Sequence, residues 1–87
     1  LVKAMDFSVV DDMIQVNDKD SFLTARKLAR EEGIFAGGSS GAAVWASLEL
    51  AKNISDEKAI VAILPDSGSR YLSKLYNDEW LKQNGFL

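Results

Sequence analysis

The most constraining feature of the 87-residue sequence is a glycine-rich turn between two apolar stretches, within residues 33–47. A short apolar run, Ile-Phe-Ala, is followed by Gly-Gly-Ser-Ser-Gly and then by apolar and small residues typical of a buried helix. Gly37 and Gly38 permit backbone conformations and close approaches that larger residues do not. Ser39 or Ser40 is a suitable N-cap for the helix, whose free amides and positive dipole end can hold an anion or a polar ligand. The turn is equally consistent with an ordinary tight connection between a strand and a helix.

The segment before this turn has the pattern of an amphipathic helix. Apolar residues recur at spacings of three and four between Phe22 and Ala29, and charged residues occupy the other faces. Asn17 and Asp18 are suitable N-terminal caps, and Gly33 stands where a glycine commonly ends a helix. We therefore expect a helix that begins at this cap and ends just before the glycine.

Three short apolar segments are predicted to be β-strands, at residues 13–16, 34–36 and 59–64. The last is a continuous apolar run ended by Pro65, which is typical of a central parallel strand covered on both faces. With the buried helix between the second and third strands, the pattern predicts a βαβ unit with a right-handed crossover. The predicted fold class is therefore α/β, a partial three-layer αβα (Rossmann-like) sheet whose missing strands belong to the rest of a longer protein or to another subunit.

Two short helices are expected near the end of the sequence. One runs from about Arg70 to Tyr76, and the other begins with Asp78 as its N-cap and stops at Gly85. The sequence does not begin with methionine and opens within a pattern, so we expect residues 1–87 to be part of one domain of a longer protein, with no internal boundary.

Composition excludes several classes of function. Ten Lys and Arg against thirteen Asp and Glu give a net charge of −3, so no basic surface for nucleic acid or for an anionic membrane is expected. The sequence contains neither Cys nor His, which excludes disulfides, thiolate or histidine metal sites and histidine-based catalytic triads. No apolar run approaches the roughly 18 to 20 residues of a membrane span.

Two loops follow the second and third predicted strands, at the position where ligands bind in open α/β sheets. Residues 37–41 and 66–69 supply hydroxyls and free amides, and Asp66 adds a carboxylate. If the two strands are neighbours, both loops face one crevice. Asp66 and Ser67 are equally explained as residues that satisfy their own turn. No catalytic pair can be picked out, so the residues alone indicate part of a small-molecule α/β enzyme.

Two motifs resemble segments shared by the cysteine synthases and the cystathionine β-synthases. They are EEGIFAGGSSGA at residues 31–42 and ILPDSGSRY at residues 63–71, in the order and at the spacing of that family. Three segments are more similar to cystathionine β-synthases: the Gly-Gly-Ser run, the Pro-Asp-Ser run and the tail at residues 78–86. Two others are more similar to cysteine synthases, namely Gly68 and residues 70–73. The chain thus resembles the C-terminal part of the catalytic core of these fold-type II pyridoxal-phosphate enzymes.

The resemblance implies roles for particular residues of this chain. The implied cofactor is pyridoxal 5′-phosphate, with the Ser67 hydroxyl donating to the pyridine nitrogen and Gly37 bordering the cofactor. Gly38, Ser39 and Asp66 are implied to lie on the substrate side. No catalytic residue is expected in this chain, because the Schiff-base lysine, the asparagine at the ring oxygen and the phosphate loop belong to family segments absent from this sequence. The chain alone is therefore expected to be inactive, and no metal is implied.

The reaction implied is β-replacement, first of all that of cystathionine β-synthase, in which L-serine and L-homocysteine give cystathionine in transsulfuration. The alternatives are cysteine synthase, which uses O-acetylserine and sulfide, and a non-catalytic module that binds a phosphate or a nucleotide at the turn of residues 37–41. The resemblance also implies a cytoplasmic parent enzyme that is a homodimer or larger. Uncovered strand edges give the isolated chain a route to self-association.

Overall fold

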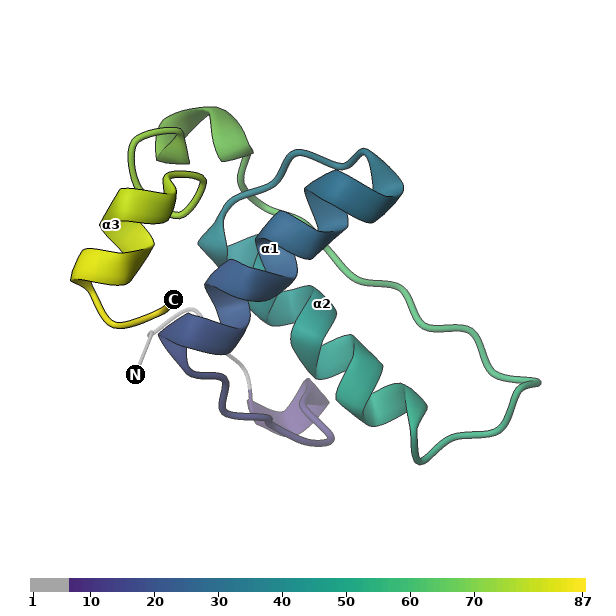
Figure 1. Ribbon diagram of the computed structural model, residues 1–87. Coiled ribbons are helices and arrows are strands. Elements are labelled where there is room, and N and C mark those ends of the chain that lie inside the picture. The colour runs from purple at the N-terminus through teal and green to yellow at the C-terminus, as the bar shows by residue number, and fades with distance from the viewer. Residues whose placement is uncertain (1–6) are drawn as a thin grey trace.

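A computed structural model describes residues 7–87 of the protein, which form a mainly helical structure (Figure 1). The elements in chain order are a 3-10 helix η1 (Phe7–Val9), α1 (Asp18–Glu32), α2 (Gly38–Ala51), a 3-10 helix η2 (Gly68–Tyr71) and α3 (Asp78–Gln83). Figure 1 shows α1 and α2 packed side by side, with α3 on one side of this pair and the arm of residues 52–66 on the other. Within the described residues, no helix has the length and apolar character needed to cross a membrane.

The first long helix, α1, forms where the sequence predicts it. The side chain of Asn17 accepts a hydrogen bond from the amide of Asp20 at 2.8 Å, which makes Asn17 the N-cap. Gly33 ends the helix in the left-handed conformation at φ 69°, and its amide donates to the carbonyl of Ala29. Both ends are therefore fixed by local chemistry, and the predicted helix and its caps are confirmed.

Small residues allow α1 and α2 to pack closely. A Cβ atom at Gly41 of α2 would overlap the carbonyl oxygen of Ser21 in α1 and would crowd Ala25. Ser21 and Ala25 are themselves buried, and the Ser21 hydroxyl donates to the carbonyl of Asn17 at 2.9 Å, so burying it leaves no unpaired donor. The contact between the helices thus depends on glycine at position 41.

The second long helix, α2, is less buried than its apolar sequence predicts. Only Ser40 and Gly41 among its residues are buried, while Leu48 and Leu50 expose 56% and 42% of their surface. The prediction of a buried helix is wrong for this structure, because α1 covers one face of α2 and no described element covers the rest.

The predicted sheet does not form among the described residues. Residues 13–16, 34–36 and 59–64 contain no strand, and the pairing is limited to one isolated antiparallel bridge, Ala36 with Ser67, where the βαβ prediction requires parallel strands. Val61 and Ile63 are 89% and 79% exposed, so the predicted central strand is instead an uncovered extended arm. A strand needs hydrogen-bonded neighbours along its edges, and residues 7–87 do not supply them.

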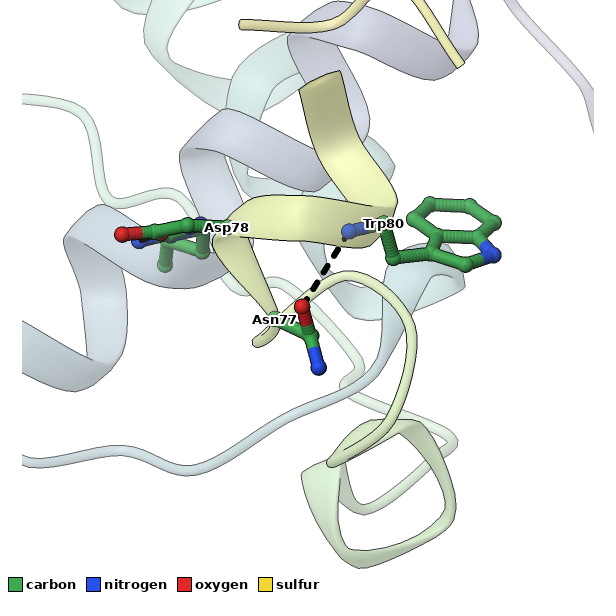
Figure 2. Close-up of polar contacts among 4 residues, drawn as sticks. Asn77, Asp78 and Trp80 are labelled. Carbon is green, nitrogen blue, oxygen red and sulfur yellow. Dashed lines mark hydrogen bonds and ion pairs between the residues drawn. The ribbon is translucent and has the colours of Figure 1, made fainter. Parts of the chain in front are cut away.

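The C-terminal part differs in detail from the two predicted helices. In place of a helix over residues 70–76, η2 ends at Tyr71 and the chain turns, because the turn buries Leu75 and brings the Tyr76 hydroxyl to the carbonyls of Ala25 and Ala36. In α3, Figure 2 shows the side-chain oxygen of Asn77 accepting a bond from the amide of Trp80. Asn77 is therefore the N-cap where Asp78 was predicted, and Asp78 is the first helical residue.

An aromatic cluster and an ion pair fix α3 against α1. The Phe22 ring lies edge-on to the rings of Trp80 and Phe86, with centroid distances of 5.7 and 5.3 Å. Arg26 of α1 pairs with Asp78 at the start of α3. At this position the Asp78 carboxylate is also stabilised by the positive end of the helix dipole. Gly85 follows α3 in a left-handed conformation at φ 78°, as expected for a residue that ends a helix.

The close contact at Gly41 gives a first prediction. We expect Gly41→Ala to destabilise the chain by about 2 kcal/mol, because the added Cβ forces α1 and α2 apart at the backbone of Ser21. Urea unfolding followed by circular dichroism measures this difference. Ser47→Ala, a change of similar size on the same helix that removes only a bond to the carbonyl of Ala43, is the control and should shift stability by less than about 0.5 kcal/mol. Equal effects of the two changes would contradict the packing argument.

Candidate functional site

The loop before α2 and the loop before η2 meet, as the sequence predicts for the two candidate ligand loops. They are joined by two backbone hydrogen bonds, Gly37 N to Asp66 O at 3.3 Å and Gly68 N to Phe35 O at 3.1 Å, which together form the antiparallel bridge between Ala36 and Ser67. The predicted residues Gly37, Gly38, Ser39, Asp66 and Ser67 are therefore gathered around one junction of the chain.

The carboxylate of Asp66 caps the N-terminus of α2. One oxygen accepts from the amide of Ser39 at 3.3 Å, and the other accepts from the amide of Ser40 at 3.1 Å and from the Ser40 hydroxyl. The helix begins after Gly37, which has no side chain to cap it. The prediction of Ser39 or Ser40 as the N-cap is therefore wrong: both lie in the first turn as donors, and the acceptor comes from a residue 26 positions after Ser40.

These contacts determine the charge state of Asp66. Burial alone raises the pKa of its carboxyl group, but hydrogen bonds from the Ser40 hydroxyl, from the amides of Ser40 and Ser39 and from the Tyr71 side chain lower the pKa below its ordinary value of 3.8. The positive end of the α2 dipole also favours the charged form. Asp66 is therefore a carboxylate at neutral pH.

The same carboxylate fills the place that an external anion would take. The free amides at the start of α2, which could hold a phosphate, already donate to Asp66. A phosphate brought to these amides would meet a negative charge. The turn thus lacks the free anion seat that a phosphate- or nucleotide-binding module needs.

The glycines at positions 37 and 38 are explained by packing within the chain. A Cβ at Gly37 would overlap the Asp66 carboxylate and the ring of Tyr71, and a Cβ at Gly38 would lie 2.9 Å from the ring of Phe22. Neither residue has a positive φ. Their glycine identity therefore needs no ligand to explain it, and the roles of Gly37 beside the cofactor and of Gly38 beside the substrate stay predictions.

Ser67 presents its hydroxyl to solvent. Its backbone is extended, with φ −96° and ψ 150°. The Asp66 side chain is engaged at α2, whereas the Ser67 side chain is exposed. Its hydroxyl has two long bonds to Ser69, each of 3.3 Å. An exposed, weakly held hydroxyl fits a role as donor to the ring nitrogen of pyridoxal phosphate, although that role is still a prediction.

Tyr71 and Tyr76 build the junction, and sequence reasoning missed both. Tyr71 donates to Asp66 and packs over Gly37. The Tyr76 hydroxyl donates to the carbonyl of Ala36, and its ring lies 4.8 Å from that of Phe35. Burial raises the pKa of Tyr76, and the nearby Asp66 charge adds to this, so its hydroxyl stays a donor at neutral pH. No local pattern signals the packing of Tyr71 over Gly37 or the bond of Tyr76 to Ala36, because these contacts join residues far apart in the sequence.

A cavity of about 320 Å³ opens beside the first turn of α2. Its lining includes Gly38, Ser39, Phe22 and Tyr71, and it does not include Ser67. Its volume falls within the range of small-molecule sites. Gly38 and Ser39, predicted on the substrate side, therefore adjoin space for a small ligand. Within residues 7–87, no cluster of His, Cys, Asp and Glu is arranged to hold a metal ion.

The chain is similar to known pyridoxal-phosphate enzymes in sequence and in structure. Residues 2–66 match the family model described as pyridoxal-phosphate dependent enzyme. Over 83 residues the chain is 46% identical to the cystathionine β-synthase of Apis mellifera, covering 95% of the chain and 16% of that protein. It is 50% identical over 72 residues to the N-(2-amino-2-carboxyethyl)-L-glutamate synthase of Ralstonia nicotianae, covering 83% of the chain and 21% of that protein.

A solved structure gives the same relationship. The crystal structure of O-ureido-L-serine synthase superposes with a TM-score of 0.78 at 41% identity, covering 90% of the chain and 27% of that structure's chain. The chain spans about a sixth of the length of the cystathionine β-synthases it matches.

The lowered pKa of Asp66 gives a second prediction. We expect Asp66→Ala to destabilise the chain by about 1 kcal/mol at pH 7, the usual cost of losing a helix cap. Because the folded-state pKa is depressed, the carboxylate contributes its full stability above its ordinary pKa of 3.8 and loses it as the pH falls through the lower folded value. The difference between wild type and variant, measured by urea unfolding, should therefore shrink toward pH 2. A difference that stays constant from pH 7 to pH 2 would count against the capping role.

Proposed function

Because the chain belongs to the family of pyridoxal-phosphate dependent enzymes, we propose that it forms part of the catalytic domain of an enzyme that replaces a substituent at Cβ of an amino acid. The observation that carries the proposal is the junction that brings the exposed Ser67, at its bridge to Ala36, next to the Gly37 turn, with an open cavity at Gly38 and Ser39. The chain spans only part of its relatives, so this activity belongs to a longer protein in which other segments complete the site.

When bound, pyridoxal phosphate withdraws electrons from the amino acid, which stabilises the negative charge that develops at Cα. In our proposal the Ser67 hydroxyl donates to the ring nitrogen. A neutral donor leaves this nitrogen unprotonated, whereas a carboxylate would hold a proton there. Ser67 is exposed and carries no charge, and the Asp66 carboxylate next to it is engaged at α2, away from the ring. With a neutral donor at the ring nitrogen, electron withdrawal by the ring would be moderate. Moderate withdrawal suits elimination followed by addition at Cβ.

The substrate side is proposed to be the opening beside α2. Ser39 is exposed at the first turn and borders the cavity, so its hydroxyl can bond a polar group of an amino-acid substrate. Gly38 borders the same cavity without a side chain that would fill it. Asp66, expected on this side from the family resemblance, supports the turn from within and does not reach the substrate in our proposal.

We propose cystathionine β-synthase chemistry, with L-serine and L-homocysteine as substrates, as the first choice for the longer protein. The similarity to the Apis mellifera cystathionine β-synthase over 95% of the chain supports this choice. Cysteine synthase chemistry is the second choice, supported by similarity to a probable cysteine synthase of Bacillus subtilis. The identity is 49% over 65 residues, which cover 75% of the chain and 21% of that protein. In that longer protein the arm at residues 59–64 is proposed to be a central strand of a three-layer αβα sheet. A cytoplasmic location is proposed from the resemblance alone.

The experiment that tests the proposal uses the full-length protein that contains this chain. The purified protein should show the visible absorbance of bound pyridoxal phosphate and form cystathionine from serine and homocysteine. A strong preference for O-acetylserine and sulfide would assign it to the cysteine synthases. Absence of both the absorbance and any β-replacement would contradict the proposal.

A third prediction concerns Ser67 in that full-length protein. Ser67→Ala removes the donor to the ring nitrogen and should lower kcat/KM for β-replacement by about tenfold, the usual worth of one hydrogen bond. Ser67→Asp should lower it further, because a carboxylate would stabilise a proton on the ring nitrogen and so change the electron demand of the ring. Ser73→Ala, at an exposed serine outside the site, is the control and should keep wild-type activity. Unchanged kinetics in both Ser67 variants would rule out contact with the ring.

A further inference from the structure

We propose that Asp66 is a positioning residue of this cofactor site: by holding the start of α2, it sets the direction in which Ser67 presents its hydroxyl. The inference rests on the proposed function and adds to it a residue that touches neither cofactor nor substrate. The contacts of Asp66, the geometry of the chain at Ser67 and the space around Gly37 support it in turn.

The first support is that Asp66 is held from several directions. Its two carboxylate oxygens accept bonds from the amides of Ser39 and Ser40, and the buried Ser40 hydroxyl donates to the same group. Its backbone carbonyl accepts from the amide of Gly37. Both the side chain and the backbone of Asp66 are therefore tied to the beginning of α2, which leaves the residue little rotational freedom.

The second support is that Ser67 follows directly in extended backbone. The side chain of Asp66 is directed toward α2, and the adjacent Ser67 pairs with Ala36 and has an exposed side chain. The hydroxyl of Ser67 has only the long bonds to Ser69 to hold it otherwise. In our proposal the bonds that hold Asp66 fix the position of the adjacent Ser67, and the bonds to Ser69 add to this.

The third support is that the carboxylate occupies space that is free only because residue 37 is glycine. The carboxylate lies where a Cβ of residue 37 would be, with the ring of Tyr71 on the same spot and its hydroxyl donating to Asp66. Loss of the carboxylate leaves the amides of Ser39 and Ser40 without this acceptor and leaves the Ser40 hydroxyl its longer bond of 3.3 Å to the carbonyl of Asp66. The loop then relaxes to satisfy these donors, and the face shown by Ser67 is no longer fixed.

A double-mutant cycle in the full-length protein separates positioning from a merely structural role. The measurement is the dissociation constant of pyridoxal phosphate for the apo-protein, by fluorescence titration, together with the absorbance of the bound cofactor. We expect Ser67→Ala to weaken binding by about fivefold to tenfold and Asp66→Ala to weaken it by a similar factor. If Asp66 acts through Ser67, adding Asp66→Ala to Ser67→Ala should weaken binding by less than about twofold more.

A matched control and a conservative variant complete the design. Asp56→Asn, the same loss of charge on the exposed turn after α2, should leave the dissociation constant unchanged in both backgrounds. Asp66→Asn keeps one acceptor oxygen for the amides and should restore part of the binding lost in Asp66→Ala. It replaces the alanine variant in the cycle if the latter does not fold.

The outcomes of this cycle test the inference about Asp66 separately from the proposed function. Coupled losses of Asp66 and Ser67, with the same change in cofactor absorbance in both single variants, support the inference. Independent losses that multiply in the double variant, in a wild type that binds pyridoxal phosphate, overturn the inference and leave the proposed function standing. A full-length wild type that binds no pyridoxal phosphate overturns the proposed function, and this inference with it.

Discussion

The contact between the Asp66 carboxylate and the first turn of α2 is the interaction on which the rest of the candidate site depends. α2 begins at a glycine and has no cap of its own, so its free amides need an acceptor from elsewhere in the chain. Asp66 supplies a charged one, and in doing so brings the loop of Ser67 against the loop of Gly37. The requirement for glycine at position 37 and the place of Tyr71 follow from making room for this carboxylate.

Residues 7–87 leave much apolar surface uncovered. The arm at residues 59–64 is apolar and extended yet exposes 89% of Val61 and 79% of Ile63, and among the described elements α1 is the one that packs on α2. Burial of such surfaces is the main source of stability in a domain, so they favour a larger structure around the chain. This agrees with a chain that spans about a sixth of its cystathionine β-synthase relatives.

Sequence reasoning succeeds here where the information is local. The caps of α1 at Asn17 and Gly33 lie next to the helix they end, and both are read correctly. The meeting of the two ligand loops is also predicted, although through a parallel sheet that residues 7–87 do not form. The cap of α2 and the Tyr76 contact with Ala36 could not be predicted, because they join residues 26 and 40 positions apart. The strands fail for a similar reason: an apolar run shows a tendency to pair, but its pairing partner decides whether a strand forms.

The most direct test of the account is an NMR pH titration of the backbone amides of Ser39 and Ser40. If they donate to the Asp66 carboxylate, both amide resonances should move with a single midpoint below 3.8, and Asp66→Asn should abolish the movement. Amides that do not titrate between pH 2 and pH 6, or that titrate with a midpoint at or above 3.8, would contradict the claim that this carboxylate holds the two loops together.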